Sequence, residues 1–206
     1  MTTVRNQHKE SYERLFAVAE GQQGYFTAKQ AAAAGFDKKN HHYHVRSGNW
    51  IRDCRGVYHL SKFPIVEHPD MVAFSLWSRD RSDTPQGVYS HETTLSVYDL
   101  SDVNPAKLHM TVPPEFRRNA EIPGVLVLHR GRLHDDEVEA MQGFRVTSPL
   151  KAIADLLAAR TVQMDHMQQA VRQAVERGYI SRSKLAAATR IPDDVKKKIE
   201  DLMENR

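Results

Sequence analysis

The side chains with the clearest chemistry lie between residues 38 and 55, where cations, an amide and a phenol recur. No acidic residue occurs between Lys38 and Asp53. Lysine and arginine bind phosphates, and asparagine and arginine can form paired hydrogen bonds with base edges. This chemistry is that of binding to double-stranded DNA. The sequence predicts the following DNA-binding residues: Lys38, Lys39, Asn40, His42, Tyr43, Arg46, Arg52 and Arg55.

A helix over residues 38–47, ended by Gly48, positions most of these side chains. At 100° per residue, His41 and Val45 face inward with His44 on their flank. The N-terminus of such a helix adds partial positive charge and free N–H groups. The outward face then holds Lys39, Asn40, Tyr43 and Arg46, with Lys38 and His42 at its edge.

Two helices are predicted before this one. The first has an apolar face at spacing i, i+3, i+4 and i+7, with Ser11 as its cap and Gly21 beyond its end. The second, over 28–34, begins at a capping-box pair formed by Thr27 and Gln30 and ends at Gly35. The apolar face of the first helix consists of Tyr12, Leu15, Phe16 and Ala19.

The connection between the second and third helices is short. Only Gly35 and Phe36 precede the next helix-start residue, Asp37, which is the spacing of a helix-turn-helix. Residues 50–60 then contain two short β-prone runs around a turn that ends at Gly56, which predicts a hairpin. Three helices followed by a hairpin predict a winged helix-turn-helix, with Arg52 and Arg55 near the tip of the wing.

The distribution of charge agrees with this interpretation. The 206 residues carry a formal net charge of +3, but residues 1–62 alone carry +5 and residues 63–206 carry −2. A basic N-terminal part joined to a slightly acidic remainder is typical of a module that binds a polyanion. No run of about 18 apolar residues and no secretory leader is found, so we expect a cytoplasmic protein that does not contact a membrane.

Other interpretations of the same residues stay open. A charged helix face is also compatible with simple solvation. The histidines at 41, 42 and 44 have no acidic or thiolate neighbour, so no metal site is predicted from them. Cys54 is the only cysteine, which excludes an intrachain disulfide and a thiolate-rich metal site. We interpret it as an inert small residue.

The N-terminal motifs resemble those of AbiEi-type antitoxins, transcriptional regulators of bacterial type IV toxin–antitoxin and abortive-infection systems. The resemblance rests on Gly24-Tyr25-Phe26-Thr27, Tyr43-His44-Val45-Arg46-Ser47-Gly48 and Arg55-Gly56-Val57-Tyr58. Because the same winged domain also precedes endonuclease-like domains, the second half of the chain has to decide between the two.

The second half has the pattern of a mixed α/β domain. Residues 63–70 contain Pro64 and Pro69 and predict a linker, followed by a strand or short helix at 71–78. Ser90 is expected to cap a short helix, and strands are expected at 107–112, 124–129 and 145–147. Helices are expected after Ser148-Pro149, from Asp165 to Gly178, and after Ser181, with a charged tail from 193 to 206. The predicted fold class is α+β: a winged helix-turn-helix over 1–62 and a mixed α/β antitoxin-type domain over 71–206.

Motifs in this half also resemble the AbiEi antitoxins, which extends the likeness over roughly residues 8–190. They are Ser90-His91-Glu92-Thr93-Thr94-Leu95, Asp102-Val103-Asn104-Pro105, Thr111-Val112-Pro113 and Val146-Thr147-Ser148-Pro149-Leu150 with Asp155-Leu156. The resemblance implies a first domain that binds its own promoter and represses it. It also implies a second domain that neutralises a nucleotidyltransferase-type toxin, with direct contact left open.

No enzymatic motif was found in the second half. A phosphate-binding glycine loop, a nucleophile elbow and a His-Glu-x-x-His motif are all absent, so no catalytic residue, metal or cofactor is predicted. His91 and Glu92 are expected to have capping or surface roles. The acidic residues 135–139 are interpreted as a solvated helix start, and Arg117, Arg118, Arg130 and Arg132 as ordinary surface.

The sequence therefore predicts a DNA-binding repressor and antitoxin rather than an enzyme. Two alternatives are kept. One is a nuclease targeted by the winged helix, and the other is a transcription factor whose second domain senses a small molecule.

Overall fold

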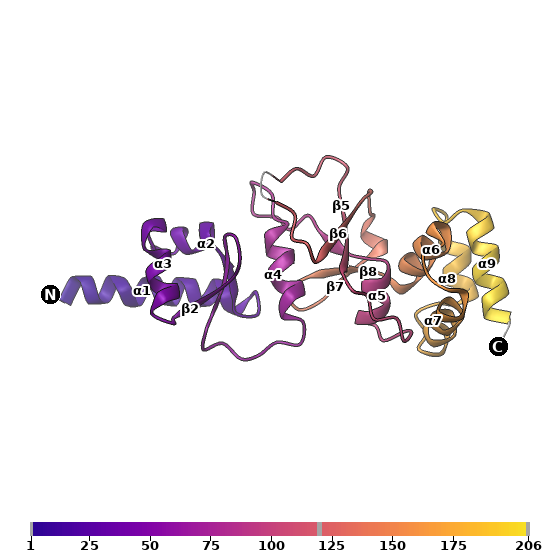
Figure 1. Ribbon diagram of the computed structural model, residues 1–206, viewed down its shortest axis with the longest axis horizontal. Helices are drawn as coiled ribbons and strands as arrows, with labels where there is room; N and C mark the ends of the chain where they lie inside the picture. Colours follow the sequence, from indigo (N-terminus) through magenta and orange to yellow (C-terminus); the bar gives the residue numbers. More distant parts are fainter. Residues whose placement is uncertain (1, 119–120, 205–206) are drawn as a thin grey trace. The chain divides into compact units, whose positions relative to one another are not determined.

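The structure is a computed structural model that describes residues 2–118 and 121–204, and its chain divides into two compact units (Figure 1). The first unit contains Met1–Gln86 and Ala140–Phe144, and the second contains Gly87–Glu139 and Arg145–Arg206. This is an α+β protein with a winged helix-turn-helix followed by a mixed α/β unit, as the sequence predicted.

The first unit has the element order of a winged helix. A three-stranded antiparallel sheet in the order β1-β3-β2 accompanies the helices. The hairpin β2–β3 was predicted, whereas the short strand β1 was not. The elements are α1 (Thr2–Glu20), β1 (Tyr25–Thr27), α2 (Ala28–Ala33), the 3-10 helix η1 (Lys38–Asn40), α3 (His41–Arg46), β2 (Trp50–Cys54), β3 (Val57–Leu60) and α4 (Pro69–Trp77).

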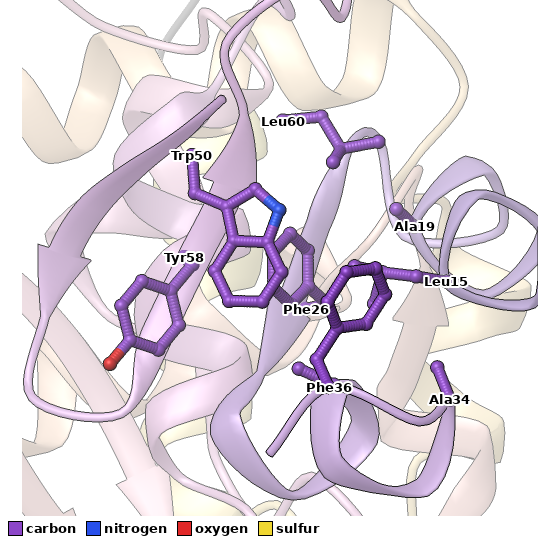
Figure 2. Packing of buried hydrophobic residues seen from close by; sticks show 9 residues of the cluster. Leu15, Ala19, Phe26, Ala34, Phe36, Trp50, Tyr58 and Leu60 are labelled. Atoms are coloured by element: carbon purple, nitrogen blue, oxygen red, sulfur yellow. The ribbon is translucent and has the colours of Figure 1, made fainter. Parts of the chain in front are cut away.

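Aromatic side chains dominate the core of this unit. Figure 2 shows the indole of Trp50 between the ring of Tyr58 and those of Phe26 and Phe36, at centroid distances of 4.9–5.7 Å. Leu15 of α1 is fully buried in the same cluster. Burial of several large rings supplies most of the stabilisation that a unit this small can obtain.

Local signals in the sequence fix the helix ends. The predicted capping box is present: the Thr27 hydroxyl accepts from Gln30 N, and the Gln30 side chain accepts from Thr27 N. Gly35 has φ +106°, which is the left-handed conformation expected after a helix. The prediction for Ser11 was wrong, because α1 begins at Thr2 and Ser11 lies buried inside it, where its hydroxyl accepts from Arg14.

The apolar face of α1 was predicted only in part. Leu15 and Ala19 are fully buried, whereas Tyr12 and Phe16 are 49% and 39% exposed. The two rings stack on each other at 6.4 Å, and Phe16 lies beside Phe63 at the same distance. A 3.6-residue period identifies a face, but it does not tell how much of that face another element covers.

The first unit extends beyond the DNA-binding domain expected at 1–62. The segment 71–78, left between strand and helix, is part of α4, which begins at Pro69 and contacts all three strands. Val72 and Trp77 of α4 are buried. The first unit includes α4 and continues as far as Gln86. The boundaries of the linker predicted at 63–70 stay a prediction.

The second unit contains a five-stranded mixed sheet in the order β6-β5-β4-β8-β7. The pairs β5–β6 and β4–β8 are parallel, and β4–β5 is antiparallel. The elements are β4 (Val88–Tyr89), α5 (Glu92–Val97), β5 (Leu108–Val112), β6 (Leu126–Arg130), the 3-10 helix η2 (Asp135–Glu137), β7 (Val138–Ala140), β8 (Arg145–Thr147), α6 (Pro149–Ala159), α7 (Met164–Glu176), α8 (Arg182–Ala187) and α9 (Asp193–Glu204).

The helix starts predicted at Ser148 and Ser181 are confirmed. The Ser148 hydroxyl accepts from Lys151 N with Pro149 at the first position, and the Ser181 hydroxyl accepts from Lys184 N. The tail forms α9, whose buried Val195 and Ile199 lie on the face that contacts α6 and α7. Residues 205–206 lie outside the described residues.

The prediction for Ser90 was wrong by one residue. His91 occupies the N-cap position of α5 without a side-chain cap, and Ser90 is fully buried. The acidic segment forms η2 rather than the start of an α-helix, and Asp136 and Glu137 pair with Arg190. No helix in the described part of the chain is long and apolar enough to cross a membrane.

Candidate nucleic-acid interface

The third helix of the winged domain is built in two parts and anchored from below. The Asp37 side chain accepts from Lys39 N at 3.1 Å and begins η1, from which α3 continues at His41. His41 is 4% exposed, and its Nε2 lies 3.0 Å from the Phe36 carbonyl oxygen. Because that oxygen can only accept, His41 carries its proton on Nε2. The bond ties the helix to the turn before it.

Trp50 supports the same helix from the sheet. The His44 ring stacks on the indole at 4.5 Å, and Phe36 meets His44 edge-on at 5.0 Å. Burial lowers the pKa of His44, with smaller contributions from nearby histidines, so this ring is neutral near pH 7. His44 thus has a packing role, which agrees with its predicted place on the inner flank.

The opposite face of this helix is open to solvent. Each of the six residues predicted to bind DNA on this segment is exposed, and Tyr43 is 67% exposed. The exposed residues are Lys38, Lys39, Asn40, His42, Tyr43 and Arg46.

Most of the cations at this surface are not neutralised within the molecule. Lys39 Nζ lies 3.2 Å from Asp37 Oδ2. Both side chains are exposed, so solvent weakens this ion pair. Within the described residues, no ion pair involves Lys38, Arg46, Arg52 or Arg55. Their charge is therefore available to a polyanion.

The wing places Arg52 on the same side as the helix. Residues 50 and 52 share one face of β2, and Arg52 lies opposite Tyr58 in the register of β3. Trp50 and Tyr58 form the face against which α3 packs. Arg55 follows in the turn, where Gly56 has φ +81°. Two exposed arginines thus accompany the helix on the wing.

The other face of the wing carries the only acidic residue of the hairpin. His59 Nδ1 lies 2.8 Å from Asp53 Oδ2, and the His59 ring lies 5.0 Å from that of Tyr25. Burial raises the pKa of Asp53, and burial together with nearby carboxylates raises that of Tyr25 to about 12. Because Asp53 contacts His59 on this other face, its carboxylate lies away from the face that bears Arg52.

The second unit contains a cluster that sequence analysis did not assemble. His91, His109 and His129 come together although they belong to three separate segments, and His109 Nε2 lies 3.1 Å from Glu92 Oε2. The pairing of β5 with β6 and the turn before α5 bring them together, so no spacing in the sequence reveals them. Among the described residues, no group of three or more His, Cys, Asp or Glu is arranged to hold a metal ion.

The first unit has the fold of a winged helix-turn-helix with exposed cations on its third helix and wing. Residues 13–60 match the model of a family described as "Transcriptional regulator, AbiEi antitoxin". The match runs from within α1 to the end of β3, and it agrees with the resemblance found in the sequence. It supports a role as a DNA-binding regulator and antitoxin, and the family is one of regulators rather than of enzymes.

The comparisons with individual proteins inform the fold and not the function. No curated protein matches the sequence. The chain is similar to the crystal structure of the RV2827C protein from Mycobacterium tuberculosis, with a TM-score of 0.63 and 11% identity over 94% of this chain and 76% of that one. At this identity the likeness concerns the fold, and it includes both units.

Proposed function

We propose that the protein is a transcriptional repressor that binds an operator in its own promoter. The observation that carries this proposal is the surface of eight exposed residues on one helix and one wing, with most of their cations unpaired within the described chain. A convex cationic helix of this kind fits the major groove, which admits an α-helix. The match of residues 13–60 to a family of transcriptional regulators supports the same role.

Each residue then has a distinct task in the proposed complex. Asn40 and Arg46 are suited to bidentate contacts with base edges, and Tyr43 supplies a ring for apolar or phosphate contact. The wing arginines grip phosphates or enter the minor groove and fix the register without reading sequence. Lys38, Lys39 and His42 contact the phosphate backbone of the DNA and support the helix there. With about 4–6 phosphates contacted, log affinity should fall with log salt at a slope of about −4 to −5.

The test is a double substitution at the helix. Lys39→Ala with Arg46→Ala should abolish specific binding to DNA from upstream of the protein's own gene, because it removes one phosphate contact and one base-reading side chain. Both side chains are exposed, so the melting temperature should stay the same. Binding is measured by gel shift against the upstream DNA and against a scrambled duplex of equal length.

A charge-matched control separates placement from net charge. Arg172→Ala with Lys197→Ala removes two exposed cations from the second unit, and this variant should bind like the wild type. Unchanged operator affinity in the Lys39/Arg46 variant, or an equal loss in the control, would sink the assignment of the helix as the interface.

We further propose that the second unit counteracts a toxin of nucleotidyltransferase type. The description of the matched family as antitoxins and the motifs of the second half support this. Expression of this protein together with a nucleotidyltransferase encoded beside its gene should rescue cells from the growth arrest that the nucleotidyltransferase causes alone. The Lys39/Arg46 variant, supplied from a constitutive promoter, should rescue equally well because it leaves the second unit intact. Continued growth arrest at equal protein level would refute the antitoxin role.

A further inference from the structure

A polar cavity of about 520 Å³ lies in the second unit, where the parallel strands β5 and β6 reach their carboxyl ends. Thr111 comes from β5, His129 from β6, and Lys151 and Asp155 lie one turn apart on α6. In α/β sheets, ligands bind in the crevice at the carboxyl ends of parallel strands. The volume falls within the range of small-molecule sites and exceeds what a single inorganic ion fills.

A chain of hydrogen bonds fixes the histidines beside this cavity. Glu92 Oε2 lies 3.1 Å from His109 Nε2, and His109 Nδ1 lies 3.1 Å from His129 Nε2. The three side chains therefore form one connected row, and the row orients the His129 ring beside the cavity.

His91 completes the cluster from another direction. Its ring stacks on His129 at 3.7 Å with 12° between the planes, and its Nδ1 lies 2.9 Å from the Ser90 hydroxyl. The buried Thr111 hydroxyl donates to Ser90 at 2.8 Å. Burial lowers the pKa of His91 to about 3 and also lowers that of His129, so both rings are neutral near pH 7. They offer planar faces and N–H groups rather than charge.

The backbone of His91 is strained. Its φ of +56° and ψ of −133° lie in a region that glycine adopts and side chains rarely do. Such conformations cluster at functional sites. The Ser90 hydroxyl accepts from Thr111 and lies 2.9 Å from His91 Nδ1, so the strained turn is held by this contact and by the stack on His129. The strain thus fixes the His91 ring at the wall of the cavity.

Cations form the remaining wall. Arg130 Nη1 donates to the carbonyl oxygens of Pro114 and Phe116 at 2.7 and 3.0 Å, which holds the guanidinium in place. Arg132 is exposed on the same wall. The single carboxylate, Asp155, is bound by Lys151, and burial raises its pKa. The cavity therefore has an excess of positive charge and a preorganised guanidinium, which suit a phosphate group.

We infer that this cavity binds a small phosphate monoester of nucleotide size, with its phosphate on the arginine and lysine side chains and its organic part against the His91–His129 pair. Such a site goes beyond operator and toxin binding and gives the second unit a ligand of its own. It is polar, unlike the apolar pocket that a sensor of hydrophobic molecules requires.

The probes are AMP, ribose 5-phosphate and adenosine, titrated separately into the full chain by calorimetry. Either ester should bind, whereas adenosine should not, because it lacks the phosphate. Adenosine binding as tightly as AMP, or no binding by either ester at millimolar concentration, overturns the proposal.

Two variants locate the site. Arg132→Ala should weaken binding of the ester by about tenfold or more, which corresponds to one lost charge-assisted hydrogen bond. His91→Gly should weaken it too, although glycine suits the backbone at that position and keeps the unit folded, as its melting temperature would show. Arg117→Ala, an exposed arginine outside the cavity, serves as the matched control and should bind normally.

A last control keeps this proposal separate from that of DNA binding. The Lys39/Arg46 double variant should lose the operator and keep the ester, because its changes lie in the first unit. If it loses the ester while Arg132→Ala and His91→Gly bind normally, the phosphate was bound by the DNA-binding face and the cavity site is wrong.

Discussion

The two units present polar residues in opposite ways. In the first unit, the cations of the helix and wing stand on an exposed surface, and most of them have no ion-pair partner within the described residues. In the second unit, histidines, hydroxyls and carboxylates bind one another around a cavity. An exposed charge retains its hydration and costs little, whereas a buried polar group has to be satisfied. The first arrangement fits a large polyanion, and the second fits a small molecule.

The supports of the two sites differ as well. Helix α3 is short, and it packs on Trp50 with Phe36 and Tyr58 beside it, so the indole is its largest support. The histidine cluster rests on paired strands and on the buried hydroxyls of Ser90 and Thr111. One substitution should therefore disable the first site without reaching the second, and this gives the largest effect that the comparison predicts.

Trp50→Ala should unfold the winged domain or leave it close to unfolding. Removal of a fully enclosed indole costs about 3–5 kcal/mol, which is a large part of the stability of a small unit. Operator binding should be lost, while AMP binding to the second unit should persist. Gel shift and calorimetry on the same preparation measure both.

Tyr43→Ala is the matched control for that experiment. It removes a large aromatic ring from the same segment, but Tyr43 is 67% exposed, so the melting temperature should hardly change. If Trp50→Ala retained operator binding at wild-type affinity, or lost AMP binding, the two sites would not have the separate supports described above.

The difference between the sites also explains what the sequence could reveal. The helix-turn-helix is local: Thr27 with Gln30, Gly35 and Asp37 act within a few residues of where they stand, and the structure has these features as predicted. The exposed DNA-binding residues follow from the same local period, although the binding of DNA by them stays a prediction. Helix starts at Ser148 and Ser181 were found for the same reason.

Non-local features were missed for equally physical reasons. Strand β1 has three residues, and it forms by pairing with β3, which lies far along the chain. His109 and His129 occupy neighbouring parallel strands, two residues out of register with each other, which no spacing along the chain encodes. Ser90 was expected to cap a helix, but the strained turn at His91 moves the helix start by one residue and buries the Ser90 hydroxyl instead. Tertiary pairing overrides the local signal in each of these cases.

A smaller expected effect is a difference between the two units in how their stability depends on pH. Three histidines have a pKa lowered mainly by burial: His44 in the first unit, and His91 and His129 in the second. A histidine with a depressed folded pKa binds fewer protons than in the unfolded chain. Its stabilising contribution is present above the unfolded pKa of about 6.5 and is lost as pH falls below it. Acidification from about pH 7.5 to about pH 5.5 should therefore destabilise both units, and the second unit more.

The chain carries its own probes for this measurement. Its two tryptophans, Trp50 and Trp77, both lie in the first unit, so their fluorescence reports on that unit alone. Hydrogen exchange, corrected for its intrinsic pH dependence, gives the stability of the second unit. The Asp155 carboxylate raises the pKa of His129, so Asp155→Asn should lower that pKa further and steepen the loss. An equal loss in both units would contradict the account of the second site as a network of buried, neutral imidazoles, because such a network has to gain charge against desolvation when it is protonated.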